Sequence, residues 1–200
     1  MSGPTLSPAD EAQARADTER WLAQAVIGLN LCPFAKAVQV KGQIHCRIWP
    51  DDDVDGLMQA LLDEAQALRE RPAEVRDTTL LVAPLALTDF LTFNDFTARA
   101  ERRLRKTGHE GDLQLASFHP HFQFAGTEPD DMGNATNQSP YPTLHLLREA
   151  SIERAVAAVP DAADIYERNI RTLEGLGPEG WQALDVGAHL SVHLNAGDRP

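Results

Sequence analysis

The chain lacks the features that mark secreted and membrane proteins. It has only two cysteines, Cys32 and Cys46, in 200 residues. Two cysteines do not make a disulfide framework, which favours a reducing compartment. The N-terminal stretch has no apolar signal-peptide core, and no hydrophobic run approaches the length of a membrane span. We therefore expect a cytoplasmic protein without a membrane partner.

Positive charge is also scarce, with 18 lysines and arginines against 30 acidic residues and a net charge of −12. Such a surface repels phosphate backbones, so we expect no nucleic-acid partner. The densest basic run, from Arg99 to Lys106, lies at the end of a predicted helix, where cations suit the helix dipole. The hydrophobic content of 42% is that of an ordinary soluble globular protein.

Hydrophobic periodicity predicts a single α/β domain over residues 17–177, with a flexible arm at 1–16 and a weakly ordered tail at 178–200. Strand patterns occur at 44–48, 78–83 and 113–118, and helical patterns at 21–29, 54–68, 88–108, from about 142, at 151–159 and at 161–177. The alternation from His189 to Leu194 fits a strand or a disordered end. We expect a small, mostly parallel sheet of about three strands or slightly more, packed with about five to six helices.

The segment from Ser117 to Glu149 is the densest in side chains that bind metals, accept protons or donate hydrogen bonds. It follows the third predicted strand, and functional loops in such sheets lie beyond the carboxyl ends of strands. Loops of this length are uncommon unless they are functional or disordered, and its aromatic residues argue against disorder. We interpret the segment as the functional site.

Two histidines in this segment suggest a metal site. His119 and His121 project to the same side of an extended backbone. Glu128 and Asp131, with Asp130 beside them, could complete a nitrogen and oxygen set suited to zinc, manganese or iron. Such an ion can activate water, so metal-assisted hydrolysis or group transfer on a small polar molecule is our leading hypothesis. Alternatively, the histidines cap strands and bond backbone carbonyls.

A proton-transfer pair is predicted further along the segment. His145 and Glu149 are four residues apart on a predicted helix and would share a face, where the carboxylate raises the basicity of the imidazole. The predicted substrate-binding residues are Arg148, Asn137, Thr127 and Gln138. Ordinary helical ion pairing and turn chemistry are the alternatives.

Cys32 supports a second hypothesis, thiol-dependent redox or transferase chemistry. Its C-P-F-A surroundings resemble the start of some glutaredoxin-like and omega-class glutathione transferase sites. In those sites the cysteine opens a helix after a strand, whereas the residues before Cys32 have a helical pattern. A buried structural cysteine is the alternative. A third hypothesis is a non-catalytic module that binds a protein or a ligand.

Four longer motifs resemble those of a known family. They are N-L-C-P-F-A-K-A-V, T-D-F-L-x-F-N-D-F, S-F-H-P-x-F-Q-F-A-G-T-E-P-D-D and S-P-Y-P-T-L-H-L-L-R-E-A-S-I. Over about Thr18 to Gly177 the chain resembles the bacterial domain-of-unknown-function family 1415. No established activity goes with that family, so the resemblance implies the fold as a whole and certifies no ligand or catalytic residue. Gln138 stands where the family has a basic residue, which weakens any proposal of an anion contact there.

Overall fold

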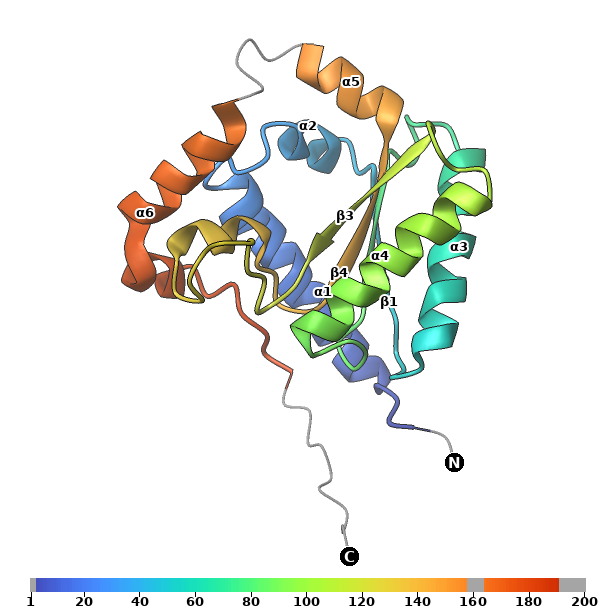
Figure 1. The fold of residues 1–200 in the computed structure, drawn as a ribbon, viewed down its shortest axis with the longest axis horizontal. Coiled ribbons are helices and arrows are strands. Elements are labelled where there is room, and N and C mark those ends of the chain that lie inside the picture. Colours follow the sequence, from blue (N-terminus) through green and yellow to red (C-terminus); the bar gives the residue numbers. More distant parts are fainter. Residues whose placement is uncertain (1–2, 158–163, 191–200) are drawn as a thin grey trace, which may run out of the picture.

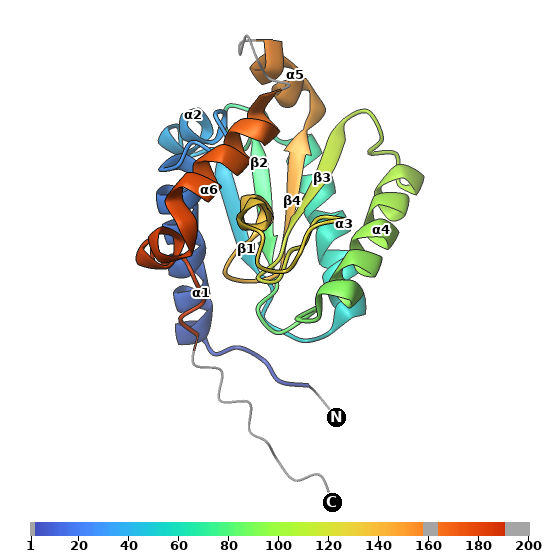
Figure 2. The same ribbon diagram turned by 60° about the vertical axis from the view of Figure 1, so that its left-hand side comes forward.

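The computed structural model describes residues 3–157 and 164–190, which form one sheet with helices on both faces (Figures 1 and 2). The four strands are β1 (Ile44–Ile48), β2 (Thr78–Val82), β3 (Leu113–Phe118) and β4 (Thr143–Arg148), in the order β1-β2-β4-β3. The α/β class is confirmed. The sheet is larger than three strands and only partly parallel, because β1 and β2 are parallel but β4 is antiparallel to both of its neighbours.

The strand that we did not predict is β4. We expected a helix from about Pro142, but the next six residues, T-L-H-L-L-R, are extended. Both edges of this segment pair, one with β2 and the other with β3. Leu144 and Leu146 enter the core on one face of the sheet, and His145 points to the opposite face. Tertiary pairing on two sides therefore overrides a local pattern that is compatible with a helix.

Two helices, α3 (Val54–Glu70) and α4 (Phe90–Lys106), cover the face of the sheet that carries Leu144 (Figure 2). Each begins at an aspartate: Asp53 accepts a hydrogen bond from the backbone of Asp55 at 3.0 Å, and Asp89 accepts one from the backbone of Thr92 at 2.8 Å. The main core lies beneath them and includes Leu57, Leu61, Leu81, Phe93 and Phe96.

The other face of the sheet is covered by α1 (Pro8–Trp21), its π-helical continuation η1 (Leu22–Ile27) and the end of α6 (Ile165–Ala183). Two shorter helices are α2 (Ala35–Val40) and α5 (Glu149–Ala157), and the 3-10 helix η2 (Met132–Asn137) packs against α6. No helix in the described ranges is long and apolar enough to cross a bilayer.

Both predicted ends of the domain differ from the structure. The predicted arm at 1–16 contains the first half of α1, because the Ser7 and Asp10 side chains form a capping box that starts the helix at Pro8. At the other end, the backbone of Gly177 is non-helical, with a φ of 69°, so the helical conformation is interrupted there as the pattern predicts. A second helical piece follows across this kink, so residues 178–183 are helical and not a loose tail. The alternation predicted for His189–Leu194 and the helix boundaries predicted between 158 and 163 lie largely outside the described residues.

Candidate functional site

The segment between β3 and β4 is folded around its own polar side chains. Asn134 is fully buried. Its side-chain oxygen accepts hydrogen bonds from the Phe124 backbone at 3.0 Å and the Thr127 hydroxyl at 2.9 Å, and its amide donates to the Glu128 carbonyl at 2.8 Å. These bonds close the loop from 124 to 134. Much of the polarity that we assigned to ligand binding therefore stabilises the loop backbone.

His119 is fully buried beside Phe90 and Phe93. Its Nδ1 accepts a hydrogen bond from the His121 backbone at 3.0 Å, so the proton is on Nε2, which donates to the Leu87 carbonyl at 3.1 Å. Burial lowers the pKa of His119, against the smaller opposing effect of the Leu87 carbonyl. Both ring nitrogens of this neutral imidazole are occupied by the protein itself.

The other predicted metal ligands, His121, Glu128 and Asp131, are exposed. Asp131 accepts a hydrogen bond from the backbone of Glu128 at 2.9 Å, which orders a turn. Among the described residues, no group of three or more histidine, cysteine, aspartate or glutamate side chains is arranged to hold a metal ion. The structure thus does not bring the four predicted ligands together, and a metal site there stays a prediction.

The predicted pair of His145 and Glu149 does not share a helical face. His145 lies on β4, whereas Glu149 is the first residue of α5. The Thr78 hydroxyl lies 2.5 Å from Nε2 of His145, and it donates its own proton to the Leu146 carbonyl at 2.7 Å. Nε2 of His145 must therefore be the donor in the shorter contact. Burial lowers the pKa of His145 to about 4, so the ring is neutral near pH 7.

The predicted substrate-binding residues bond backbone carbonyls. The Arg148 guanidinium donates to the carbonyls of Leu68, Arg71 and Arg76, and so completes the C-terminal end of α3. Asn137 also donates to a backbone carbonyl, that of Ser117, at 3.0 Å, and Gln138 donates to that of Phe122 at 3.4 Å. The Thr127 hydroxyl lies 2.9 Å from the Phe124 carbonyl and 2.9 Å from the Asn134 side-chain oxygen, and shares its one proton between them. Only the Thr127 contact, three residues along the chain, is of the kind that the turn-chemistry alternative describes. The other contacts join segments that are far apart in the sequence.

Cys32 lies in the turn between η1 and α2 and is partly buried. Its carbonyl accepts a hydrogen bond from Ala35 at 3.2 Å, which leads the chain into α2. Both cysteines are free thiols. Burial raises the pKa of Cys46 to about 11, in keeping with its place in the sheet core. Thiol chemistry at Cys32 stays a prediction.

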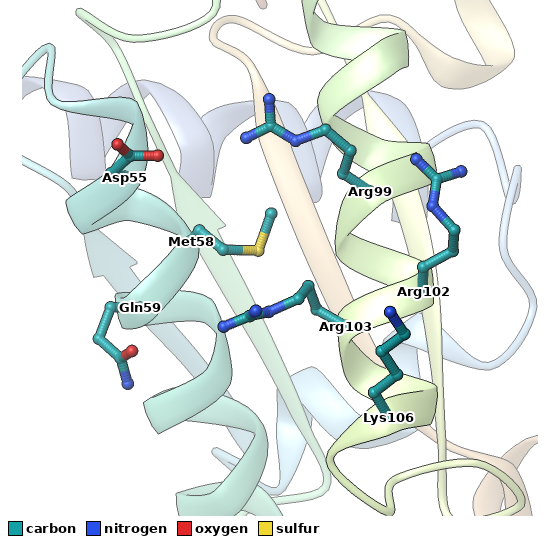
Figure 3. A pocket seen from close by; sticks show the side chains of 7 residues that line it. All are labelled: Asp55, Met58, Gln59, Arg99, Arg102, Arg103 and Lys106. Atoms are coloured by element: carbon teal, nitrogen blue, oxygen red, sulfur yellow. The ribbon is translucent and has the colours of Figure 1, made fainter.

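A different site lies between α3 and α4 (Figure 3). This groove has a volume of about 400 Å³. Its floor includes the nearly buried Met58. We call it the basic groove, and its lining residues are Asp55, Met58, Gln59, Arg99, Arg102, Arg103 and Lys106. Figure 3 shows Arg99 and Arg103 reaching from α4 toward α3 on either side of Met58, while Arg102 and Lys106 extend from the outer side of α4.

The four cations of the basic groove are exposed, and none of them forms an ion pair with a carboxylate of the described chain. Arg99 also lies over the Phe96 ring, 5.7 Å from its centroid. The sequence contained the signal for this site. Positions 99, 102, 103 and 106 have the spacing i, i+3, i+4, i+7 and so share one helix face. We interpreted the run only as a complement to the helix dipole and missed the groove.

Comparison with known proteins identifies a family but no activity. No curated protein and no solved structure matched the chain. The family model described as "Protein of unknown function (DUF1415)" matches residues 13–183, from within α1 to the end of α6. The chain therefore belongs to this family, as its motifs indicated.

Proposed function

We propose that the protein binds a small molecule with several anionic groups in the basic groove. The supporting observation is that four cations gather on one face of α4 and have no carboxylate partner among the described residues. They do so in a protein whose net charge is −12. Their guanidinium and ammonium groups are the donors that recognise phosphate and carboxylate.

The fold alone does not explain this cluster. Arg99 with Arg103, and Arg102 with Lys106, are like-charge pairs at i, i+4, and each pair destabilises a helix by about 0.2–0.5 kcal/mol. Only Arg103, Arg105 and Lys106 lie in the last turn of α4, where the helix dipole favours a cation. A bound anion would remove the repulsion between the cations, so a ligand site accounts for their arrangement.

The dimensions favour a small molecule. A volume of about 400 Å³ lies within the range of about 300–1,000 Å³ typical of small-molecule pockets. The strongly negative net charge opposes the approach of a long nucleic acid, whose binding depends on many phosphate contacts. A short anion needs only the local field of the groove, which is positive.

The enzymatic hypotheses are separate from this proposal. Metal-assisted hydrolysis or group transfer, thiol chemistry at Cys32 and a cytoplasmic location stay predictions. The hydrogen bonds of His119 and Asn134 weigh against a metal or substrate role for those side chains, whereas the basic groove offers donors with no competing protein partner among the described residues.

Isothermal titration calorimetry with tripolyphosphate tests the proposal. We expect the double variant Arg99→Gln/Arg103→Gln to lose at least about tenfold in affinity, because charge-assisted hydrogen bonds contribute about 1.5–3 kcal/mol each. The matched control is Arg105→Gln/Arg171→Gln, which removes the same charge from exposed positions outside the groove. The proposal is wrong if the wild-type protein does not bind tripolyphosphate, or if both double variants lose affinity equally.

A further inference from the structure

The basic groove has different chemistry at its two ends. Figure 3 shows Asp55 level with Arg99 at one end, with Arg103 and Lys106 displaced along α4 toward the other. The stretch of α4 from Arg99 to Lys106 covers about 10 Å at 1.5 Å per residue. One end therefore has both a carboxylate and a cation, which form no ion pair with each other, and the other end has cations alone.

Asp55 is free to contact a ligand. It is exposed, and its side chain forms neither an ion pair nor a hydrogen bond with another described residue. Its carboxylate can only accept hydrogen bonds at neutral pH. A phosphate placed beside it would be repelled, whereas a hydroxyl or amino group of a ligand would be held.

The middle of the groove suits a flat apolar group. The thioether of Met58 makes favourable contacts with aromatic rings. The guanidinium groups of Arg99 and Arg103 flank it (Figure 3), and arginine stacks on aromatic faces. The Gln59 side chain, which also lines the groove, offers both a donor and an acceptor at its edge.

The cationic end suits more than one phosphate. Arg103 can form a two-pronged contact with phosphate oxygens, and Lys106 adds a second positive charge. Arg102 adds a third from the outer side of α4, where its guanidinium points back toward the level of Arg99 (Figure 3). A single phosphate presents too few oxygens to satisfy all three groups. A chain of two or three phosphates distributes its charge along the helix and can engage each of them.

On these grounds we infer that the ligand of the basic groove is a nucleoside di- or triphosphate. Its phosphates would lie against Arg102, Arg103 and Lys106, its base near Met58, and a sugar hydroxyl or base amino group at Asp55. Acidic side chains bind ribose hydroxyls in this way in dinucleotide sites. The inference rests on the proposed function, since it assigns a ligand class to the same groove.

The test compares adenosine triphosphate with tripolyphosphate in the wild-type protein and in Asp55→Ala, by calorimetry. We expect Asp55→Ala to weaken nucleotide binding by at least about tenfold, because a hydrogen bond to a charged group is lost. The same change should strengthen tripolyphosphate binding, because a repulsive charge is removed. Glu101→Ala, which removes one negative charge from α4 outside the groove, should change neither affinity by more than about twofold.

The outcomes separate the two claims. If the wild-type protein binds neither compound, the proposed function itself fails. If both compounds bind but Asp55→Ala strengthens both, or leaves the nucleotide affinity unchanged, the groove is an anion site and the nucleotide inference is overturned. Opposite shifts for the two compounds, absent in Glu101→Ala, support the inference.

Discussion

The Tyr141 hydroxyl donates a 2.6 Å hydrogen bond to the carboxylate of Asp17, a residue 124 positions earlier in the chain. Asp17 is fully buried and also accepts from the His189 backbone at 2.8 Å and from Arg20 at 3.1 Å. Burial raises the pKa of Asp17, but the hydrogen bonds from Tyr141 and the other partners together lower it by more than burial raises it. The pKa of Asp17 therefore lies below its ordinary value. One buried charge thus holds together α1, the approach to β4 and the C-terminal segment.

Tyr141→Phe should destabilise the protein by about 1.5–3 kcal/mol, because it deletes a buried hydrogen bond to a charged acceptor. The free energy of unfolding in urea measures the loss. Tyr166→Phe is the matched control, since Tyr166 is exposed on α6 and its hydroxyl has no hydrogen bond within the described chain. Equal stability of the two variants would mean that the bond between Tyr141 and Asp17 adds nothing.

Asn134→Asp should unfold the loop that we first interpreted as a metal site. The substitution keeps the shape but replaces the amide that donates to the Glu128 carbonyl with an oxygen that repels it. We expect a loss of about 3 kcal/mol or more, because one oxygen of the buried carboxylate has no donor and faces a carbonyl oxygen. Hydrogen exchange should speed up at amides 123–131. Asn94→Asp, on the exposed face of α4, should leave both measurements unchanged.

Local signals in the sequence predicted much of the fold. Asp53 caps α3, directly before the helical pattern predicted from residue 54. The periodic spacing of apolar residues in α3 and α4 matches the faces that these helices bury. β4 could not be predicted locally, because Pro142 suits a helix start and Leu146 with Leu147 breaks the alternation of a strand. Only its pairing with β2 and β3, which are distant in sequence, decides its conformation.

The candidate site shows a similar division. Composition cannot distinguish an asparagine that binds a ligand from one that builds a loop, because the difference is whether a backbone carbonyl lies within reach, as Glu128 does for Asn134. The basic groove was predictable in part, since the spacing from Arg99 to Lys106 places four cations on one face. The other wall of the groove, with Asp55 and Met58, depends on how α3 packs against α4. It could not be predicted from the sequence of either helix alone.

Alkylation of the native protein should modify one thiol, that of Cys32. The pKa of Cys46 is raised to about 11 by burial, so its thiolate is scarce at pH 8. Mass spectrometry after treatment with iodoacetamide should show a single adduct, which Cys32→Ser removes and Cys46→Ser retains. If Cys32 is alkylated faster in the native protein than in the urea-unfolded protein, the result would support thiol chemistry. Slower alkylation in the native protein would argue for a structural cysteine.

Acid should destabilise the protein partly through His145. Its pKa is about 4 in the folded state because of burial, and about 6.5 in an unfolded chain. The unfolded state therefore takes up the proton first as the pH falls. The neutral ring contributes fully to the free energy of unfolding above about pH 6.5. This contribution decreases by up to about 3 kcal/mol as the pH falls toward 4.

Burial also lowers the pKa of His109 and His119, so these two rings too make the folded protein less stable in acid. The variant His145→Gln is therefore needed to separate the contribution of His145. In urea titrations at pH 7.5, 6, 5 and 4, the variant should lose less stability on acidification than the wild-type protein. His121→Gln, at an exposed position, should follow the wild-type curve. Parallel curves for all three proteins would place the pKa of His145 near that of a free imidazole. That result would contradict the effect of burial, because desolvation makes protonation of His145 unfavourable while its Nε2 donates to Thr78.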